Sequence, residues 1–132
     1  MSSNNHQTVL LVENDLAMRQ LYERELAKEF RVLSVSMEQI AFDDICFDEL
    51  DAAVVGLDTR FKQSYQILEK INLKTKNFSI PLIVYSSLEE RRSEVLISIT
   101  AYLVQPVLPS TLLQEVMQSV LSTPGSNSTR RR

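Results

Sequence analysis

Five short apolar segments, separated by stretches with helical periodicity, are the feature that most constrains how this chain can fold. The third segment, residues 52–55, is Ala-Ala-Val-Val without a polar interruption. Such a run is typical of a strand that is covered on both faces in a parallel sheet. The other predicted strands are residues 8–12, 30–35, 80–85 and 101–104. Strands that alternate with helices imply right-handed crossovers, so we predict an α/β fold with a doubly wound, five-stranded parallel sheet in three α/β/α layers.

Five helices are predicted to connect and follow these strands. Asp15 is expected to cap the first, and Ser110 begins a capping-box pattern at the last. The second helix, which opens at Ser36, has the weakest apolar periodicity, and residues 72–79 are expected to be a linker. The predicted helices cover residues 15–28, 36–50, 65–71, 89–98 and 110–121.

The chain is long enough for one domain and too short for two, and its composition is that of an ordinary soluble protein. We place the domain at residues 8–122, between a polar, disordered lead at 1–7 and a flexible tail or linker at 123–132. The formal net charge is −3, and six acidic residues lie between Glu38 and Asp51. Such a surface repels phosphate backbones, which argues against nucleic-acid binding. The acidic segment is expected to be a solvated helix face, with a docking site for a basic partner as the alternative.

Several classes of function are disfavoured by which residues the chain has. Cys46 is the single cysteine and His6 the single histidine, in the polar lead. These counts leave no pair for a disulfide, no folded Ser-His-Asp or Cys-His site and no zinc site, so we expect no enzyme activity and no bound metal. No apolar run approaches the roughly 18 residues of a membrane span, and no signal peptide follows Met1. The sequence therefore predicts a cytoplasmic domain without a membrane contact.

Polar residues follow the predicted strands at their carboxyl ends, where ligands and chemistry gather in open α/β sheets. The third strand is unusual because it ends in Gly56, one of two glycines in the chain. Glycine weakens a strand, so it usually marks a bend or a close backbone approach. The residues expected to converge on one crevice are Glu13, Asn14, Asp15, Gly56, Asp58, Ser86 and Gln105.

The order of these motifs resembles the receiver domain of bacterial response regulators (CheY-like), over roughly residues 8 to 122. The matching motifs are Val-Glu-Asn-Asp at the end of the first strand, Ile-Pro-Leu-Ile-Val-Tyr-Ser-Ser at the fourth and Tyr-Leu-Val-Gln-Pro at the fifth. The resemblance implies the flavodoxin-like (βα)5 receiver fold. It also implies a role in phosphorelay signal transduction in a two-component system.

Carried over position by position, the resemblance implies a degenerate phosphorylation site. Gly56 falls where the family has its phosphoacceptor aspartate, Asn14 where it has the main magnesium carboxylate, and Gln105 where it has a lysine. Glu13 keeps the first acid, and Ser86 keeps the hydroxyl, which is either a hydrogen-bonding group or a helix cap.

These replacements remove the parts that phosphoryl transfer needs: a nucleophilic oxygen, a cation site and a compensating positive charge. We therefore expect a pseudo-receiver that acts through protein contacts, without phosphorylation and without a cofactor. One alternative is a working phosphoacceptor at Asp58 with magnesium. The other is a small-ligand sensor in a crevice that Gly56 has widened.

Receiver domains bind partners and dimerise through their fourth helix, fifth strand and fifth helix. The resemblance therefore implies a protein partner, or a second copy of the chain, at that face. Arg91, Arg92 and an exposed Tyr102 belong to it, and Tyr102 matches the family's switch aromatic.

Overall fold

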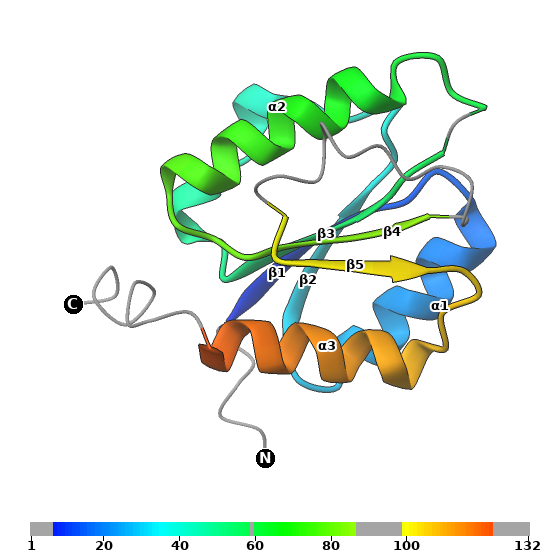
Figure 1. Ribbon diagram of the computed structural model, residues 1–132, viewed down its shortest axis with the longest axis vertical. Coiled ribbons are helices and arrows are strands. Elements are labelled where there is room, and N and C mark those ends of the chain that lie inside the picture. Colours follow the sequence, from blue (N-terminus) through cyan, green and yellow to red (C-terminus); the bar gives the residue numbers. More distant parts are fainter. Residues whose placement is uncertain (1–6, 59, 87–98, 123–132) are drawn as a thin grey trace.

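A parallel sheet forms the centre of the structure, a computed structural model that describes residues 7–58, 60–86 and 99–122. Its strands lie in the order β2-β1-β3-β4-β5, the order of flavodoxin-like folds (Figure 1). This confirms the predicted fold class. The strands are β1 (Thr8–Val12), β2 (Arg31–Val35), β3 (Ala52–Gly56), β4 (Leu82–Ser86) and β5 (Ala101–Val104).

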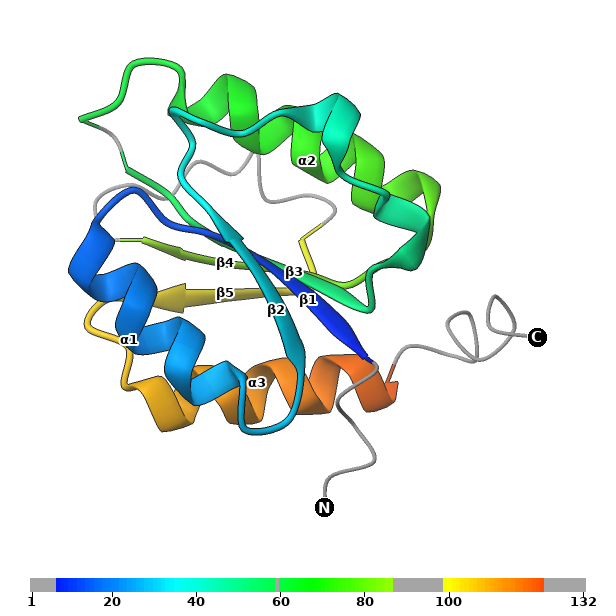
Figure 2. The ribbon, with the colours of Figure 1, turned by 180° about the vertical axis from the view of Figure 1, so that it is seen from behind.

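Helices cover both faces of this sheet. On one face lie α1 (Leu16–Leu26) and α3 (Pro109–Ser122), and on the other lies α2 (Ser64–Asn77) (Figures 1 and 2). Side chains alternate along each strand, so every central strand contributes to two cores. The core on the α2 side and the core under α1 and α3 each contain residues of β1, β3 and β4. This two-sided burial explains why these strands appear in the sequence as uninterrupted apolar runs.

The segment between β2 and β3 differs from its prediction. In place of a helix over 36–50, it contains two short 3-10 turns, Phe42–Asp44 and Phe47–Glu49. The rings of Phe42 and Phe47 stack with centroids 6.4 Å apart, and Phe47 is buried. A spacing of five residues would place these rings on different sides of a continuous α-helix, so packing both against the same core favours the turns.

Two other boundaries were also predicted wrongly. α2 continues to Asn77 through most of the expected linker, because Thr75 is buried against the core and its hydroxyl donates to the carbonyl of Asn72 (3.0 Å). α3 begins at Pro109, so Ser110 lies within its first turn and does not cap it. Proline suits this position because the first helical N–H has no intrahelical partner. The helix predicted over 89–98 lies outside the described residues.

Candidate functional site

The carboxyl ends of β1, β3, β4 and β5 meet at one edge of the sheet, as predicted. Glu13 follows β1, Gly56 ends β3, Ser86 ends β4 and Gln105 follows β5. The register pairs Gly56 directly with Tyr85 of β4. Residues that pair across two neighbouring strands project to the same face of the sheet. The side chain of Tyr85 therefore lies on the same face as a side chain at position 56 would, which is the face covered by α1 and α3.

The space beside Gly56 is filled by two side chains. A β-carbon built on Gly56 would lie 2.5 Å from Oε1 of Glu13, 2.6 Å from the hydroxyl oxygen of Tyr85 and 2.7 Å from its Cε1. Real β-carbon contacts are essentially never this short. The expectation that Gly56 widens the crevice is therefore wrong, because glycine is needed here to let Glu13 and Tyr85 occupy the position.

Glu13 is buried, with 8% of its surface exposed, and both oxygens of its carboxylate accept hydrogen bonds. The hydroxyl of Tyr85 donates to Oε1, and the backbone N–H of Asp15 donates to Oε2 at 2.9 Å. Burial raises the pKa of Glu13 above its ordinary value, although these two hydrogen bonds oppose the shift. The guanidinium of Arg19 contacts the backbone carbonyl of Glu13 (2.7 Å).

Tyr85 connects this carboxylate to the opposite side of the crevice. Its ring packs edge-to-face on Tyr22 of α1, with centroids 5.3 Å apart. The hydroxyl of Tyr22 donates to the carbonyl of Val107 at 2.7 Å, and the N–H of Val107 donates to Oε1 of Gln105 at 3.0 Å. Burial and the charge of Glu13 raise the pKa of both tyrosines, so both remain protonated donors at neutral pH. The contacts link β1, β4, α1 and the β5–α3 loop.

The amide of Asn14 lies beside this network and bridges two loops. Its Oδ1 accepts from the N–H of Met37 (2.6 Å), and its Nδ2 donates to Oδ2 of Asp58 (3.3 Å). The other oxygen of Asp58 accepts from the backbone and side chain of Arg60, each at 3.1 Å. Burial acts to raise the pKa of Asp58, but the hydrogen bonds from Arg60 and Asn14 outweigh it, so the pKa is lowered.

The remaining predicted site residues are Ser86, Tyr102, Arg91 and Arg92, and the structure describes only the first two. The hydroxyl of Ser86 is buried and has no hydrogen-bond partner among the described residues. Tyr102 is half-buried against the core on the α2 side rather than exposed. Arg91 and Arg92 lie outside the described residues.

Tyr85 is the residue that sequence analysis missed. A signal was present, because a large aromatic in one strand and the only strand glycine in another suggest a large-small pair. Recognising this pair requires the register between β3 and β4, which cannot be derived from the sequence pattern alone.

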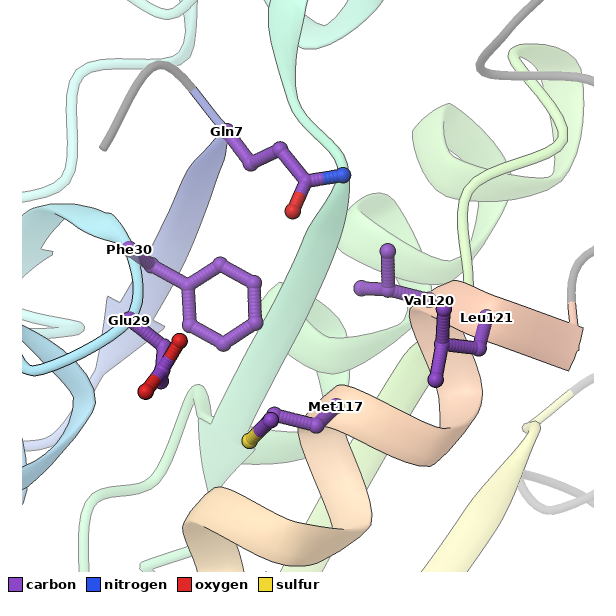
Figure 3. A pocket seen from close by; sticks show the side chains of 6 residues that line it. All are labelled: Gln7, Glu29, Phe30, Met117, Val120 and Leu121. Atoms are coloured by element: carbon purple, nitrogen blue, oxygen red, sulfur yellow. The ribbon is translucent and has the colours of Figure 1, made fainter. Parts of the chain in front are cut away.

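An apolar cavity of about 210 Å³ lies at the opposite, amino-terminal edge of the sheet. Figure 3 shows Phe30 on one side of it and Met117 and Val120 of α3 on the other, with Gln7 and Glu29 at its rim. Within the described ranges, no three acidic, cysteine or histidine side chains gather as a metal site would require. No helix in these ranges has the length and apolar character needed to span a bilayer.

No protein-family model and no curated protein matches this sequence significantly. Solved structures do match its fold. A response regulator receiver domain protein (CheY-like) from Methanospirillum hungatei JF-1 has a TM-score of 0.70 and 18% identity, covering 89% of this chain and 95% of that one. A receiver domain protein from Clostridium thermocellum has a TM-score of 0.70 and 15% identity, with coverage of 87% and 94%.

A third match is an adenylate cyclase from Rhodopirellula baltica, with a TM-score of 0.75, 13% identity and coverage of 96% of each chain. Identities this low establish shared architecture, not shared activity. The chain has the fold of CheY-like receiver domains.

Proposed function

We propose that this chain is a cytoplasmic signalling domain of the receiver type that acts through protein contacts, without aspartyl phosphorylation. The receiver fold supports the signalling role. The Glu13–Tyr85 pair, which fills the position of the phosphoacceptor side chain, carries the proposal of phosphorylation independence.

Phosphoryl transfer to this edge would need an oxygen nucleophile on β3 that a phosphodonor can approach in line. Gly56 offers no such oxygen, and the hydroxyl of Tyr85 is buried, protonated and bonded to Glu13. Asp58 is ionised, but Asn14 and Arg60 already bond its oxygens. The nucleophile is therefore absent at one position and engaged at the other.

The residues present do not fit a magnesium ion. Magnesium is held by one or two carboxylates in near-octahedral geometry. Both oxygens of Glu13 accept hydrogen bonds from the protein, and Oδ1 of Asn14 is used by Met37. Binding the ion would break these bonds and leave a buried tyrosine hydroxyl without its acceptor, which is unfavourable.

The partner face in this proposal lies along β5 and the start of α3. The helix predicted over 89–98, which belongs to the same face in the resemblance, lies outside the described residues. Val104 is 40% exposed and Leu108 is 66% exposed on this side. Exposed apolar residues beside an edge strand are a common feature of protein interfaces. A protein partner or a second copy of the chain would bind there.

Incubation with acetyl phosphate and magnesium, followed by intact-mass measurement, tests the proposal. We expect no phosphoryl adduct on the wild-type chain. The matched control is a variant with the family's residues restored (Asn14→Asp, Gly56→Asp, Gln105→Lys) and with Tyr85→Val to make room for the new aspartate, which should gain a hydroxylamine-labile adduct. A labile adduct on the wild-type chain that disappears in Asp58→Ala would refute the proposal and support the alternative phosphoacceptor.

A further inference from the structure

The β2–β3 connection leaves part of the sheet uncovered. Leu33 of β2 pairs with Leu10 of β1, whose side chain lies in the core on the α2 side. Because two 3-10 turns replace the expected helix, Leu33 remains 40% exposed. An open hollow of about 250 Å³ lies beside it, lined by Arg31, Leu33, Asp44, Cys46 and Glu49 among others.

The rim of this hollow carries unpaired negative charge. Asp43, Asp44 and Glu49 are exposed, and they take part in neither of the ion pairs found in the described part of the chain, Lys28–Glu25 and Arg60–Asp58. Arg31 is the one basic residue that lines the hollow. An exposed apolar surface beside an excess of carboxylates is complementary to arginine or lysine side chains, because their aliphatic stems pack on the apolar surface and their charged ends pair with the carboxylates.

The chain has such a segment after α3, whose last turn lies near the hollow. Residues 123–132, which lie outside the described residues, follow α3 and end in Arg130-Arg131-Arg132. Leu121 in the last turn of α3 lines the apolar cavity together with Gln7 and Phe30. Gln7 directly precedes Thr8, the first residue of β1, and Phe30 directly precedes Arg31, the first residue of β2. Thr8 and Arg31 line the hollow, so the cavity and the hollow are adjacent.

The last turn of α3, after which the basic segment follows in sequence, therefore lies at the same end of the molecule as the acidic turns (Figures 1 and 2). Ten residues of extended chain reach on the order of 30 Å, enough to cross the edge formed by the first residues of β1 and β2.

We infer that Arg130, Arg131 and Arg132 bind in the acidic hollow of their own chain. The contact is electrostatic and intramolecular, so it depends strongly on salt and not on protein concentration. Its consequence is a β2–β3 surface that a basic segment of another protein can reach only by displacing these arginines. This surface is separate from the β5 face of the proposed function.

Paramagnetic relaxation enhancement in the full chain tests the inference. A nitroxide is attached to the single thiol of the double variant Cys46→Ser, Ser128→Cys, which leaves the arginines and the hollow free of the label. Backbone amide signals of residues 31–33 and 43–49 are then followed at low salt. We expect their relaxation enhancement to be at least about threefold above that of a matched labelled variant in which the three arginines are replaced by glutamine.

Two further controls locate the contact. Neutralising the rim (Asp43→Asn, Asp44→Asn, Glu49→Gln) should reduce the enhancement to the level of the glutamine variant. So should about 1 M salt, where the Debye length is about 3 Å. None of the substituted rim residues is buried, so the fold should persist, and unchanged amide shifts in the sheet verify this.

Three results would overturn the inference. The first is equal enhancement with arginine and glutamine tails, which would mean that tethering alone explains it. The second is enhancement centred on Gln7, Phe30 and Met117, which would place the segment in the apolar cavity. The third is relaxation enhancement of the amide signals of an isotope-labelled chain that carries no nitroxide, after it is mixed with a spin-labelled chain that carries no isotope label. This result would mean that the arginines in the hollow come from a second copy.

Discussion

The carboxyl-edge crevice and the β2–β3 connection are opposites in how they treat polar groups. At the crevice, Glu13 and Tyr85 are almost fully buried, and each polar side-chain atom of the pair bonds to another group of the protein. At the connection, Asp43, Asp44 and Glu49 are exposed beside a half-open apolar floor and form no ion pair with another described residue. The fold has thus filled the carboxyl edge of the sheet and exposed a surface that a helix was expected to cover.

This difference teaches that a glycine at the end of a buried strand need not leave a pocket. A buried charge is tolerated only when it is paired or hydrogen-bonded, and an empty space in a core costs packing energy. Gly56 together with a large Tyr85 satisfies both conditions, because the tyrosine supplies the volume and a donor for Glu13. We expect the crevice to be rigid and sensitive to substitution, and the connection to be tolerant.

Tyr85→Ala should give the largest effect. It removes a ring that is 1% exposed, its contact with Tyr22 and its hydrogen bond to Glu13, so we expect a loss of about 3–5 kcal/mol in the free energy of unfolding. Urea denaturation measures it. Leu33→Ala in the open region is the control and should cost clearly less, since that side chain is 40% exposed. Similar losses in the free energy of unfolding for the two variants would contradict the difference between a tightly packed crevice and an open connection.

Gly56→Ala tests how tightly the crevice is filled. The added methyl group would overlap Glu13 and Tyr85, which predicts a loss of about 1–3 kcal/mol despite the usual advantage of alanine over glycine in a strand. Combining it with Tyr85→Val should make the double variant more stable than the sum of the single effects predicts. Stabilisation by Gly56→Ala alone would show that the space beside Gly56 is open.

The pH dependence of stability tests the charge of Glu13, with a smaller expected effect because only one carboxyl group titrates. Burial raises its pKa in the folded chain above 4.5, so the folded state takes up the proton first as the pH falls. Its contribution is fully present below the unfolded pKa and is lost as the pH rises through the folded pKa. The urea midpoint is measured against pH for the wild-type chain and for Glu13→Gln. The variant should lack the fall in stability that the wild-type chain shows as the pH rises through the folded pKa of Glu13. Parallel profiles would contradict the raised pKa.

Neutralising the connection (Asp43→Asn, Asp44→Asn, Glu49→Gln) should give the smallest effect. These side chains are exposed, and even an exposed ion pair contributes little, so we expect a change within about 0.5 kcal/mol in the free energy of unfolding. Thermal and urea unfolding of the triple variant beside wild type provide the measurement. A destabilisation comparable to that of Gly56→Ala would mean that the carboxylates support the turns, and the open region would then be structural.

The sequence by itself determined the five parallel strands, the two-sided burial of the central strands β1, β3 and β4, and the meeting of the residues that follow the strands at one edge. Strand patterns are local, and the crossover rule follows from chain chirality, so neither requires knowledge of distant contacts. The weak periodicity after Ser36 was a poorer guide, because stacking of Phe42 on Phe47 overrode the local helical signal.

Only the tertiary structure decided what fills the crevice and what the β2–β3 connection exposes. The register pairs Gly56 with Tyr85, and whether a glycine opens a pocket or admits a neighbour depends on which side chain that register places beside it. The exposure of Leu33 likewise follows from a helix that did not form. Both outcomes are set by non-local packing, which residue order along the chain does not encode in any short pattern.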